Sequence, residues 1–145
     1  MREIAVRQVD ISDTRNLRQA VLRPHETVAD LADSDNLDSF ALGAFDGEEL
    51  LGVGLIAPDD APGVWRVRGM ATAPHARGEG VGTAVLDGLL VHAVAGGAVR
   101  VWCNARTPAR TLYERAGMRV CSAEFELPDI GPHYVMEIAF DASAR

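Results

Sequence analysis

At 145 residues the chain is long enough to bury a substantial core, and we expect a single domain over residues 1–145. Hydrophobic residues make up 48% of it and charged residues 24%, which is ordinary for a globular protein. The net charge of −7 argues against nucleic acid as the main partner, because phosphate backbones attract basic surfaces, and it is compatible with a cationic amine ligand.

The hydropathy pattern favours a cytoplasmic protein with no membrane partner. No apolar run approaches the roughly 18 residues that a membrane span needs. The opening MREIAVRQVD carries charge where a signal peptide has its apolar stretch. Cys103 and Cys121 suit reduced thiols in strands better than a disulfide framework. The four histidines lack metal-ligand spacing, and we expect no bound metal.

The N-terminal part predicts one strand and one helix before an irregular stretch. Residues 4–9 favour a short strand. Ser12 or Asp13 caps the following helix, which Pro24 terminates. The acidic segment HETVADLADSDN, residues 25–36, indicates an irregular connector with one more helical turn at most.

Two turns then separate three predicted antiparallel strands. Residues 40–45 and 50–57 have the apolar pattern of strands, and the Asp46-Gly47 turn between them is a strong hairpin signal. The Glu48-Glu49 pair makes this loop longer than two residues. A second turn at residues 58–63, PDDAPG, leads into the third strand.

The third strand alternates in hydropathy and ends at a proline. We expect its two faces to carry different residues: Trp65, Val67 and Gly69 on one, and Arg66, Arg68 and Met70 on the other. Pro74 ends the strand because proline has no N–H to give to a ladder.

A glycine turn follows and opens a helix that Gly96-Gly97 stops. Glycine stands at every second position of the turn, which comprises Arg77, Gly78, Glu79, Gly80, Val81, Gly82 and Thr83. Glycine allows positive φ and a close approach of the backbone to a ligand. The helix start directs unpaired N–H groups and a positive dipole end at one point. The turn therefore predicts a phosphate site.

The spacing of the glycines excludes two known phosphate-binding patterns and fits a third. The nucleotide loop GxxxxGK[ST] needs a lysine and a hydroxyl after its last glycine, and Val-Gly-Thr stands here instead. The dinucleotide pattern GxGxxG fails because its last glycine falls on Thr83. The pattern [QR]-x-x-G-x-[GA] fits residues 77–82, and a plain connector between strand and helix is the alternative.

The C-terminal part predicts one more helix between strands. Residues 99–104 form a strand that a right-handed crossover places parallel to the strand before the glycine turn. Thr107 caps the next helix, with Pro108 at its first position and Gly117 at its left-handed end. The chain then ends in strands at 118–125 and 133–140, joined by ELPDIGP, and a frayed end at 141–145.

Two motifs together resemble the GNAT superfamily of N-acetyltransferases. They are the glycine turn and the stretch Ala109-Arg110-Thr111-Leu112-Tyr113-Glu114-Arg115-Ala116-Gly117-Met118, which fits the family pattern A-x-x-x-Y-x-x-x-G-[FM]. The resemblance implies an α/β (α+β) acyltransferase fold. Its sheet is mixed and mostly antiparallel, is splayed at the central parallel strands, and is flanked by helices.

The resemblance also implies how acetyl-CoA is held. The pyrophosphate lies on the glycine turn, and the pantetheine arm follows main-chain groups of Met70, Ala71 and Thr72. Asn104 reaches the cofactor from a strand end. Arg106 stands where many members have an asparagine, and it meets a phosphate or reaches solvent.

Catalytic roles follow from the same resemblance. Tyr113 is the general acid that protonates the departing thiolate, since a phenol of pKa about 10 nearly matches a thiol; core filling is the alternative. His133, in a glycine–x–histidine turn similar to that of a bacterial subgroup, is a base or a structural hydrogen-bonder. The other candidate bases are Glu124, Glu126 and Asp129.

We therefore expect an acetyl-CoA-dependent N-acetyltransferase in which a primary amine of a small molecule attacks the thioester directly, in a ternary complex. Neither cysteine has a sequence neighbour that would make it an acyl carrier. Residues 25–36 shape the acceptor site or form a solvated connector. If Arg68 points into the cleft, it favours an acidic or phosphorylated acceptor.

Other functions stay open at this point. A non-catalytic CoA-binding or regulatory module on the same fold predicts cofactor binding without turnover. A protein N-terminal or lysine acetyltransferase predicts a wide cleft between residues 25–36 and the loop 126–133. A monomer and a homodimer are both compatible with the sequence.

Overall fold

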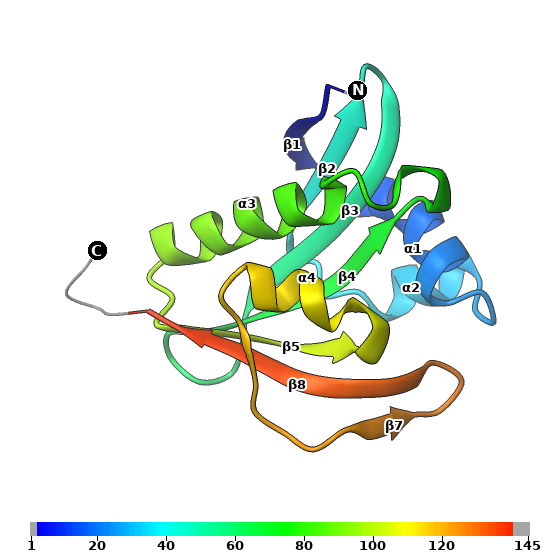
Figure 1. Cartoon of the computed structure of the whole chain (residues 1–145). Helices are drawn as coiled ribbons and strands as arrows, with labels where there is room; N and C mark the ends of the chain where they lie inside the picture. Colours follow the sequence, from blue (N-terminus) through cyan, green and yellow to red (C-terminus); the bar gives the residue numbers. More distant parts are fainter. Residues whose placement is uncertain (1–2, 141–145) are drawn as a thin grey trace.

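The computed structural model describes residues 3–140 as one sheet flanked by helices. The strands are β1 (Ala5–Val9), β2 (Phe40–Asp46), β3 (Glu49–Pro58), β4 (Val64–Thr72), β5 (Arg100–Arg106), β6 (Arg119–Val120), β7 (Phe125–Leu127) and β8 (Gly131–Ala139). The helices are α1 (Arg15–Leu22), α2 (Val28–Ser34), α3 (Val81–Ala95) and α4 (Arg110–Arg115), with 3-10 turns η1 (Ile11–Thr14), η2 (Pro74–Ala76) and η3 (Thr107–Ala109). The sheet order is β1-β2-β3-β4-β5-β8-β6, and β7 pairs with β8 (Figure 1).

The sheet divides where β4 meets β5. The first four strands pair antiparallel, and β5 pairs antiparallel with β8 over seven residue pairs. β4 and β5 run parallel but pair at only three positions, from Val64↔Arg100 to Arg66↔Trp102. Beyond Arg66 the two strands diverge, as Figure 1 shows. The predicted splay at the central parallel strands is confirmed.

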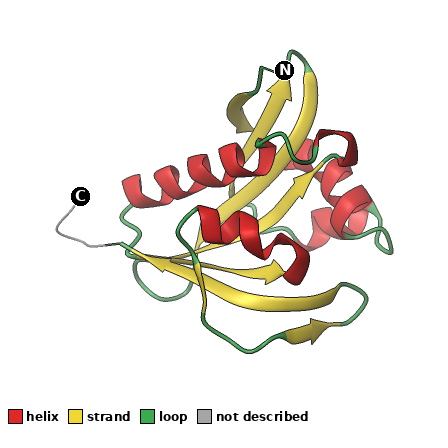
Figure 2. Ribbon diagram, viewed as in Figure 1, coloured by secondary structure: helices red, strands yellow, loops and turns green. Residues whose placement is uncertain are grey.

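Helices cover both faces of the sheet (Figure 2). α3 packs on one face, where a Cβ on Gly54 of β3 would meet Val85 and Leu89. α4 lies beside α3, and α1 packs on the other face against β4. Because these α3 side chains are fully buried, the glycine turn at the start of this helix is held in place by the core.

A β-bulge in β4 changes the predicted alternation of its faces. Gly69 and Met70 together stand opposite Gly54, because the register shifts between Val53↔Ala71 and Leu55↔Arg68. Gly69 has φ 65° and lies against Arg18 on the α1 face, whereas the Met70 sulfur lies against Gly54 on the α3 face. The prediction that Gly69 shares a face with Trp65 and Val67 is therefore wrong, because the extra residue of a bulge shifts the later side chains to the opposite face.

Local hydrogen bonds correct three predictions in the N-terminal part. The first helix is preceded by η1, which is capped by Asp10, whose side chain accepts from the Ser12 N–H. The N-cap of α1 itself is Thr14, without a side-chain cap, so neither Ser12 nor Asp13 caps this helix. Residues 25–36 contain the two-turn helix α2, because Thr27 forms a capping box with Asp30. The β2–β3 loop has only two residues, since Asp46 pairs with Glu49.

Two predictions for the C-terminal part are wrong because a side-chain hydroxyl forms an unexpected hydrogen bond. The Thr107 hydroxyl donates to Glu124 (2.8 Å) instead of capping the next helix, which begins as a 3-10 turn. The predicted strand 118–125 is broken into β6 and β7, because the Ser122 hydroxyl accepts from the Val135 N–H (2.9 Å). Gly117 has the predicted positive φ, at 97°. The predicted frayed end at 141–145 lies outside the described residues.

Two further features concern the cysteines and the helices. Cys103 lies buried in β5, whereas Cys121 is exposed and lies between β6 and β7 rather than in the predicted strand; both are free thiols. No helix within residues 3–140 is both long enough and apolar enough to cross a membrane.

Candidate active site

The glycine turn between β4 and α3 leaves open space in front of a helix start. Gly78 and Gly80 have φ of 79° and 82°, and Gly80 is the N-cap of α3. A Cβ at either glycine would meet no atom within 4 Å. Gly82 is helical, and its Cβ would lie 3.3 Å from Leu112, so the third glycine serves close packing. The first two glycines give the geometry of an anion site.

A cavity of about 610 Å³ opens where β4 and β5 diverge. Its walls come from α1, α2, β4, β5, the start of α4 and the β7–β8 turn. The predicted site residues that line it are Met70, Asn104, Tyr113 and His133. Ala71, Thr72 and residues 77–83 do not line it. The predicted site therefore has two parts, a cavity and an open turn, and the end of β4 runs between them.

Tyr113 is a buried phenol at one wall of the cavity. Its residue is 6% exposed, and burial raises the pKa of the phenol well above its usual value. The expectation of a phenol pKa near 10 is therefore wrong at this site. Burial also raises the pKa of the neighbouring Cys103 thiol, to about 12. Burial therefore keeps both side chains in their neutral, protonated forms at neutral pH.

His133 is held in one orientation by the turn before it. The residue is 4% exposed, and its Nδ1 lies 2.7 Å from the Gly131 carbonyl oxygen. A carbonyl only accepts hydrogen bonds, so Nδ1 carries the hydrogen and Nε2 is the basic nitrogen of the neutral ring. The Phe125 ring stacks on the imidazole at a centroid distance of 5.9 Å. The structural hydrogen bond therefore leaves one nitrogen for proton transfer.

The carboxylates of the cavity differ from those that the sequence suggested. Glu124 accepts from Thr107, and neither Glu126 nor Asp129 lines the cavity. Glu26 and Asp35 line it instead, and no sequence motif marks them. Both belong to residues 25–36, so this segment forms a wall of the cavity rather than a solvated connector.

A buried ion pair fixes that wall. The Arg18 guanidinium donates to both oxygens of Asp35, at 2.7 and 3.0 Å, and the Arg15 Nε lies 3.1 Å from one of them. A Cβ on Gly69 would lie 2.8 Å from the Arg18 Nε, so the bulge glycine makes room for this side chain. One signal could have revealed Arg18: it has i, i+4 spacing to Leu22 on the buried side of α1.

Replacing Asp35 by asparagine is expected to lower the free energy of unfolding at pH 7 by about 3–5 kcal/mol, because Arg18 would be left buried without its partner. The Asp35 side chain is 5% exposed; burial raises its pKa, but hydrogen bonds from Arg18 and Arg15 outweigh this and lower it overall. The contribution is therefore present above pH about 4 and is lost as pH falls further. Urea unfolding of both proteins between pH 3 and 8 measures this.

Asp33→Asn on the same helix is the control, because Asp33 is exposed. It should change stability by less than about 0.5 kcal/mol. A difference between wild type and Asp35→Asn that stays constant down to pH 3 contradicts the ion-pair explanation.

The sequence model of the acetyltransferase (GNAT) family matches residues 8–118, well over half of the chain. The chain belongs to the acetyltransferase (GNAT) family. This membership supports acyltransferase activity that depends on acetyl-CoA. The chain is also 29% identical over 140 residues to the uncharacterized N-acetyltransferase YitI of Bacillus subtilis, covering 92% of this chain and 94% of that protein.

Solved structures of GNAT enzymes have the same fold. The ribosomal-protein-S18-alanine N-acetyltransferase of Escherichia coli superimposes with a TM-score of 0.76 at 14% identity, covering 94% of each chain. An aminoglycoside 6'-N-acetyltransferase complexed with coenzyme A gives a TM-score of 0.77 at 13% identity, covering 93% of this chain and 96% of that one. In the described residues, no group of three or more His, Cys, Asp or Glu side chains is arranged to hold a metal ion.

Proposed function

We propose that this GNAT enzyme transfers an acetyl group from acetyl-CoA to the primary amine of a small molecule. The observation that carries the proposal is the pairing of an open glycine turn at the start of α3 with a cavity that Tyr113 and His133 line. The cavity volume of about 610 Å³ is in the range of small-molecule sites, which favours a small acceptor over a protein. We also propose that the chain forms one domain and that the enzyme acts in the cytoplasm.

The residues of the splay fit an extended, phosphate-bearing cosubstrate. The N–H groups of residues 78–83 would hold the pyrophosphate at the open turn, with Arg77 beside them. Pairing between β4 and β5 ends at Arg66, so the main-chain groups that face β5 farther along β4 have no strand partner there. Those of Met70, Ala71 and Thr72 suit the amides of the pantetheine arm. Asn104 follows the last paired β5 residue and contributes from the opposite strand.

The side chains of the cavity supply the proton transfers. Acetyl-CoA supplies the thioester, whose C–S bond breaks as the amine nitrogen forms the new C–N bond. Tyr113 gives its proton to the departing sulfur, and the His133 Nε2 accepts the proton that the amine loses. The Met70 N–H, at the β4 bulge, donates to the carbonyl oxygen as negative charge develops on it.

The thiols of the chain support direct attack in a ternary complex rather than an acyl-enzyme route. Burial raises the pKa of Cys103 to about 12, so its thiolate is scarce at neutral pH. The pKa of Cys121 is also raised, chiefly by burial and by Glu137, and this residue does not line the cavity. Neither cysteine is activated as a nucleophile.

A thermal-shift experiment with acetyl-CoA, CoA and ATP tests the proposal. Acetyl-CoA and CoA should raise the unfolding midpoint because they bind only the folded state, and ATP should not. Product formation with a panel of primary amines then separates an enzyme from a CoA-binding module, which would bind without turnover. Equal stabilisation by ATP, or none by any of the three, contradicts the CoA site.

A further inference from the structure

The cavity carries an excess of positive charge although the chain as a whole is acidic. The net charge of the chain is −7. The charged side chains that line the cavity are nevertheless mostly cationic, with five arginines and two carboxylates: Arg18, Arg23, Arg66, Arg68, Arg106, Glu26 and Asp35. A cavity with this balance attracts negative charge and repels a simple cationic amine.

The two carboxylates are already engaged by two of the arginines. Asp35 binds Arg18 through both oxygens, as described above. Glu26 lies 3.5 Å from the Arg23 Nε. Within residues 3–140, no carboxylate lies within ion-pair distance of the three remaining cavity arginines: Arg66, Arg68 and Arg106.

These three arginines come from the two strands that diverge at the splay. Arg66 and Arg68 are two positions apart on β4, and Val67 between them is buried, so both lie on the α1 face of the sheet. The Arg66 guanidinium lies 4.4 Å from the Trp102 ring centroid, and its Nε is buried without a hydrogen-bond partner. Arg106 on β5 donates one hydrogen bond, to the Leu22 carbonyl at 2.6 Å.

The surroundings of Arg66 and Arg106 disfavour the cationic form of these two side chains and thereby favour a bound anion. Burial, with the neighbouring Arg68, lowers the pKa of Arg66, and burial, with Arg23, lowers that of Arg106. Asp59 interacts with Arg66 and Arg68 at longer range, but it accepts from the Trp102 indole N–H and does not line the cavity. A ligand oxyanion would relieve this repulsion and could bind the arginine forks in bidentate fashion.

We propose that the acceptor amine also bears a carboxylate or a phosphate, which Arg66 and Arg68 bind from β4 and Arg106 binds from β5. This inference rests on the proposed function, because it concerns the acceptor of the same reaction. The phosphates of the cosubstrate do not account for these arginines, since no residue of the glycine turn lines the cavity. The acceptor is then a zwitterionic or anionic amine, with the anion on the arginines and the nitrogen toward Tyr113 and His133.

Matched pairs of small amines test this preference in the CoA-loaded protein. Glycine is compared with glycinamide for the carboxylate, and O-phosphoethanolamine with ethanolamine for the phosphate. Thermal stabilisation reports binding, and kcat/KM with acetyl-CoA reports turnover. In at least one pair the anionic amine should be favoured about 10- to 100-fold in affinity or kcat/KM, which is typical of a hydrogen-bonded charge pair. The pair that responds identifies the anion.

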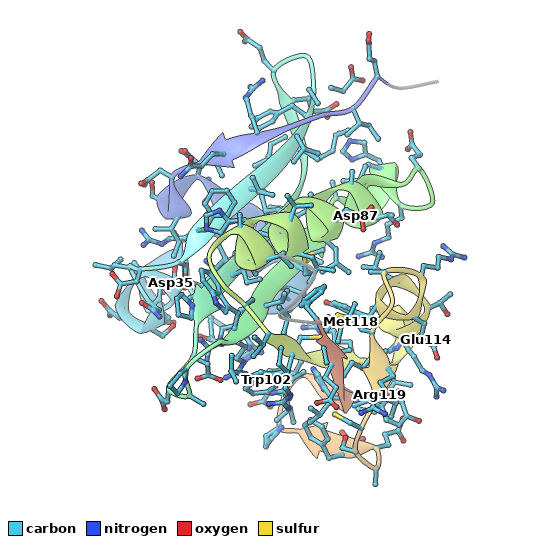
Figure 3. The ribbon with its side chains drawn as sticks, turned by 90° about the vertical axis from the view of Figure 1, so that its left-hand side faces the viewer. Asp35, Asp87, Trp102, Glu114, Met118 and Arg119 are labelled. Carbon is cyan, nitrogen blue, oxygen red and sulfur yellow. The ribbon has the colours of Figure 1, made fainter. Side chains whose placement is uncertain are left out.

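Arginine variants connect the preference to the cavity. Arg68→Gln should reduce the anionic preference about 10-fold, and Arg68→Lys should restore part of it. Arg68 is exposed, so its replacement does not threaten folding. Arg119→Gln is the control for lost charge: Arg119 lies on β6, outside the cavity lining and across the molecule from Asp35 (Figure 3).

The outcomes distinguish failure of the anionic-acceptor inference from failure of the proposed acetyltransferase function. Equal or weaker binding and turnover of both anionic amines, relative to their neutral partners, overturns the inference and leaves the acetyltransferase proposal intact. An unchanged preference in Arg68→Gln and in Arg66→Gln also overturns it. Failure of CoA itself to stabilise the protein is a different result, because it contradicts the proposed function.

Discussion

Tyr113→Phe is expected to lower kcat at least 100-fold while leaving the dissociation constant of CoA within about twofold of wild type, since a general acid contributes about 10²–10⁴ in rate. The phenyl ring would keep its buried place in the core, and only the proton donor would be lost. Because burial raises the pKa of this phenol, the wild-type acid stays protonated at alkaline pH. Activity should therefore not fall between pH 8 and 10 through ionisation of Tyr113.

Tyr134→Phe is the matched control, because Tyr134 lies on β8, outside the cavity lining, and loses the same hydroxyl group. Its kcat should stay within about twofold of wild type. Steady-state kinetics and calorimetric CoA binding give both quantities. Equal kcat for Tyr113→Phe and wild type would remove Tyr113 from the acid role and leave it as core filling.

Gly80→Glu is expected to weaken CoA binding more than 100-fold. Gly80 caps α3 with φ 82°, and the added side chain would enter the open space in front of the helix start. A carboxylate there repels a pyrophosphate and takes the N–H groups that would bind it. Isothermal titration with CoA, together with the unfolding midpoint of the free protein, measures the effect on binding apart from the effect on folding.

Two glutamine variants separate the causes. Gly80→Gln has the size of glutamate without its charge and should bind CoA more tightly than Gly80→Glu. Gly47→Gln places the same side chain on another glycine with positive φ (60°) and open surroundings, so it reproduces the backbone strain alone. CoA binding by Gly80→Glu at wild-type affinity would show that the glycine turn is only a connector.

Local sequence signals predicted most of the elements that hold the candidate site. The Asp46-Gly47 turn, the proline after β4 and the Gly96-Gly97 stop each depend on the backbone of one or two residues, and the structure has all three. The glycine turn was also predictable, because its geometry depends on φ and not on a distant partner. These features are encoded within a few residues, so reading along the chain finds them.

The predictions that failed in β4, in the segment between β6 and β7 and at Asp35 depend on partners far along the chain. The bulge at Gly69-Met70 is set by the register with β3, and the break between β6 and β7 by a hydrogen bond from Val135 to Ser122. Asp35 was missed as a cavity residue because its partner, Arg18, lies on another helix. The raised pKa of Tyr113 follows from burial, which no short motif carries.

The three-pair junction between β4 and β5 also has a consequence for how the enzyme can diversify. Beyond these three pairs, both strands present main-chain groups, which every residue type has. Binding of a cosubstrate to these groups, as proposed, would therefore tolerate many side-chain substitutions in the two strands. The arginines that line the neighbouring cavity act through their side chains instead, and single replacements alter the cavity charge. If both sites are used as proposed, single replacements can therefore change acceptor preference while cosubstrate binding is kept.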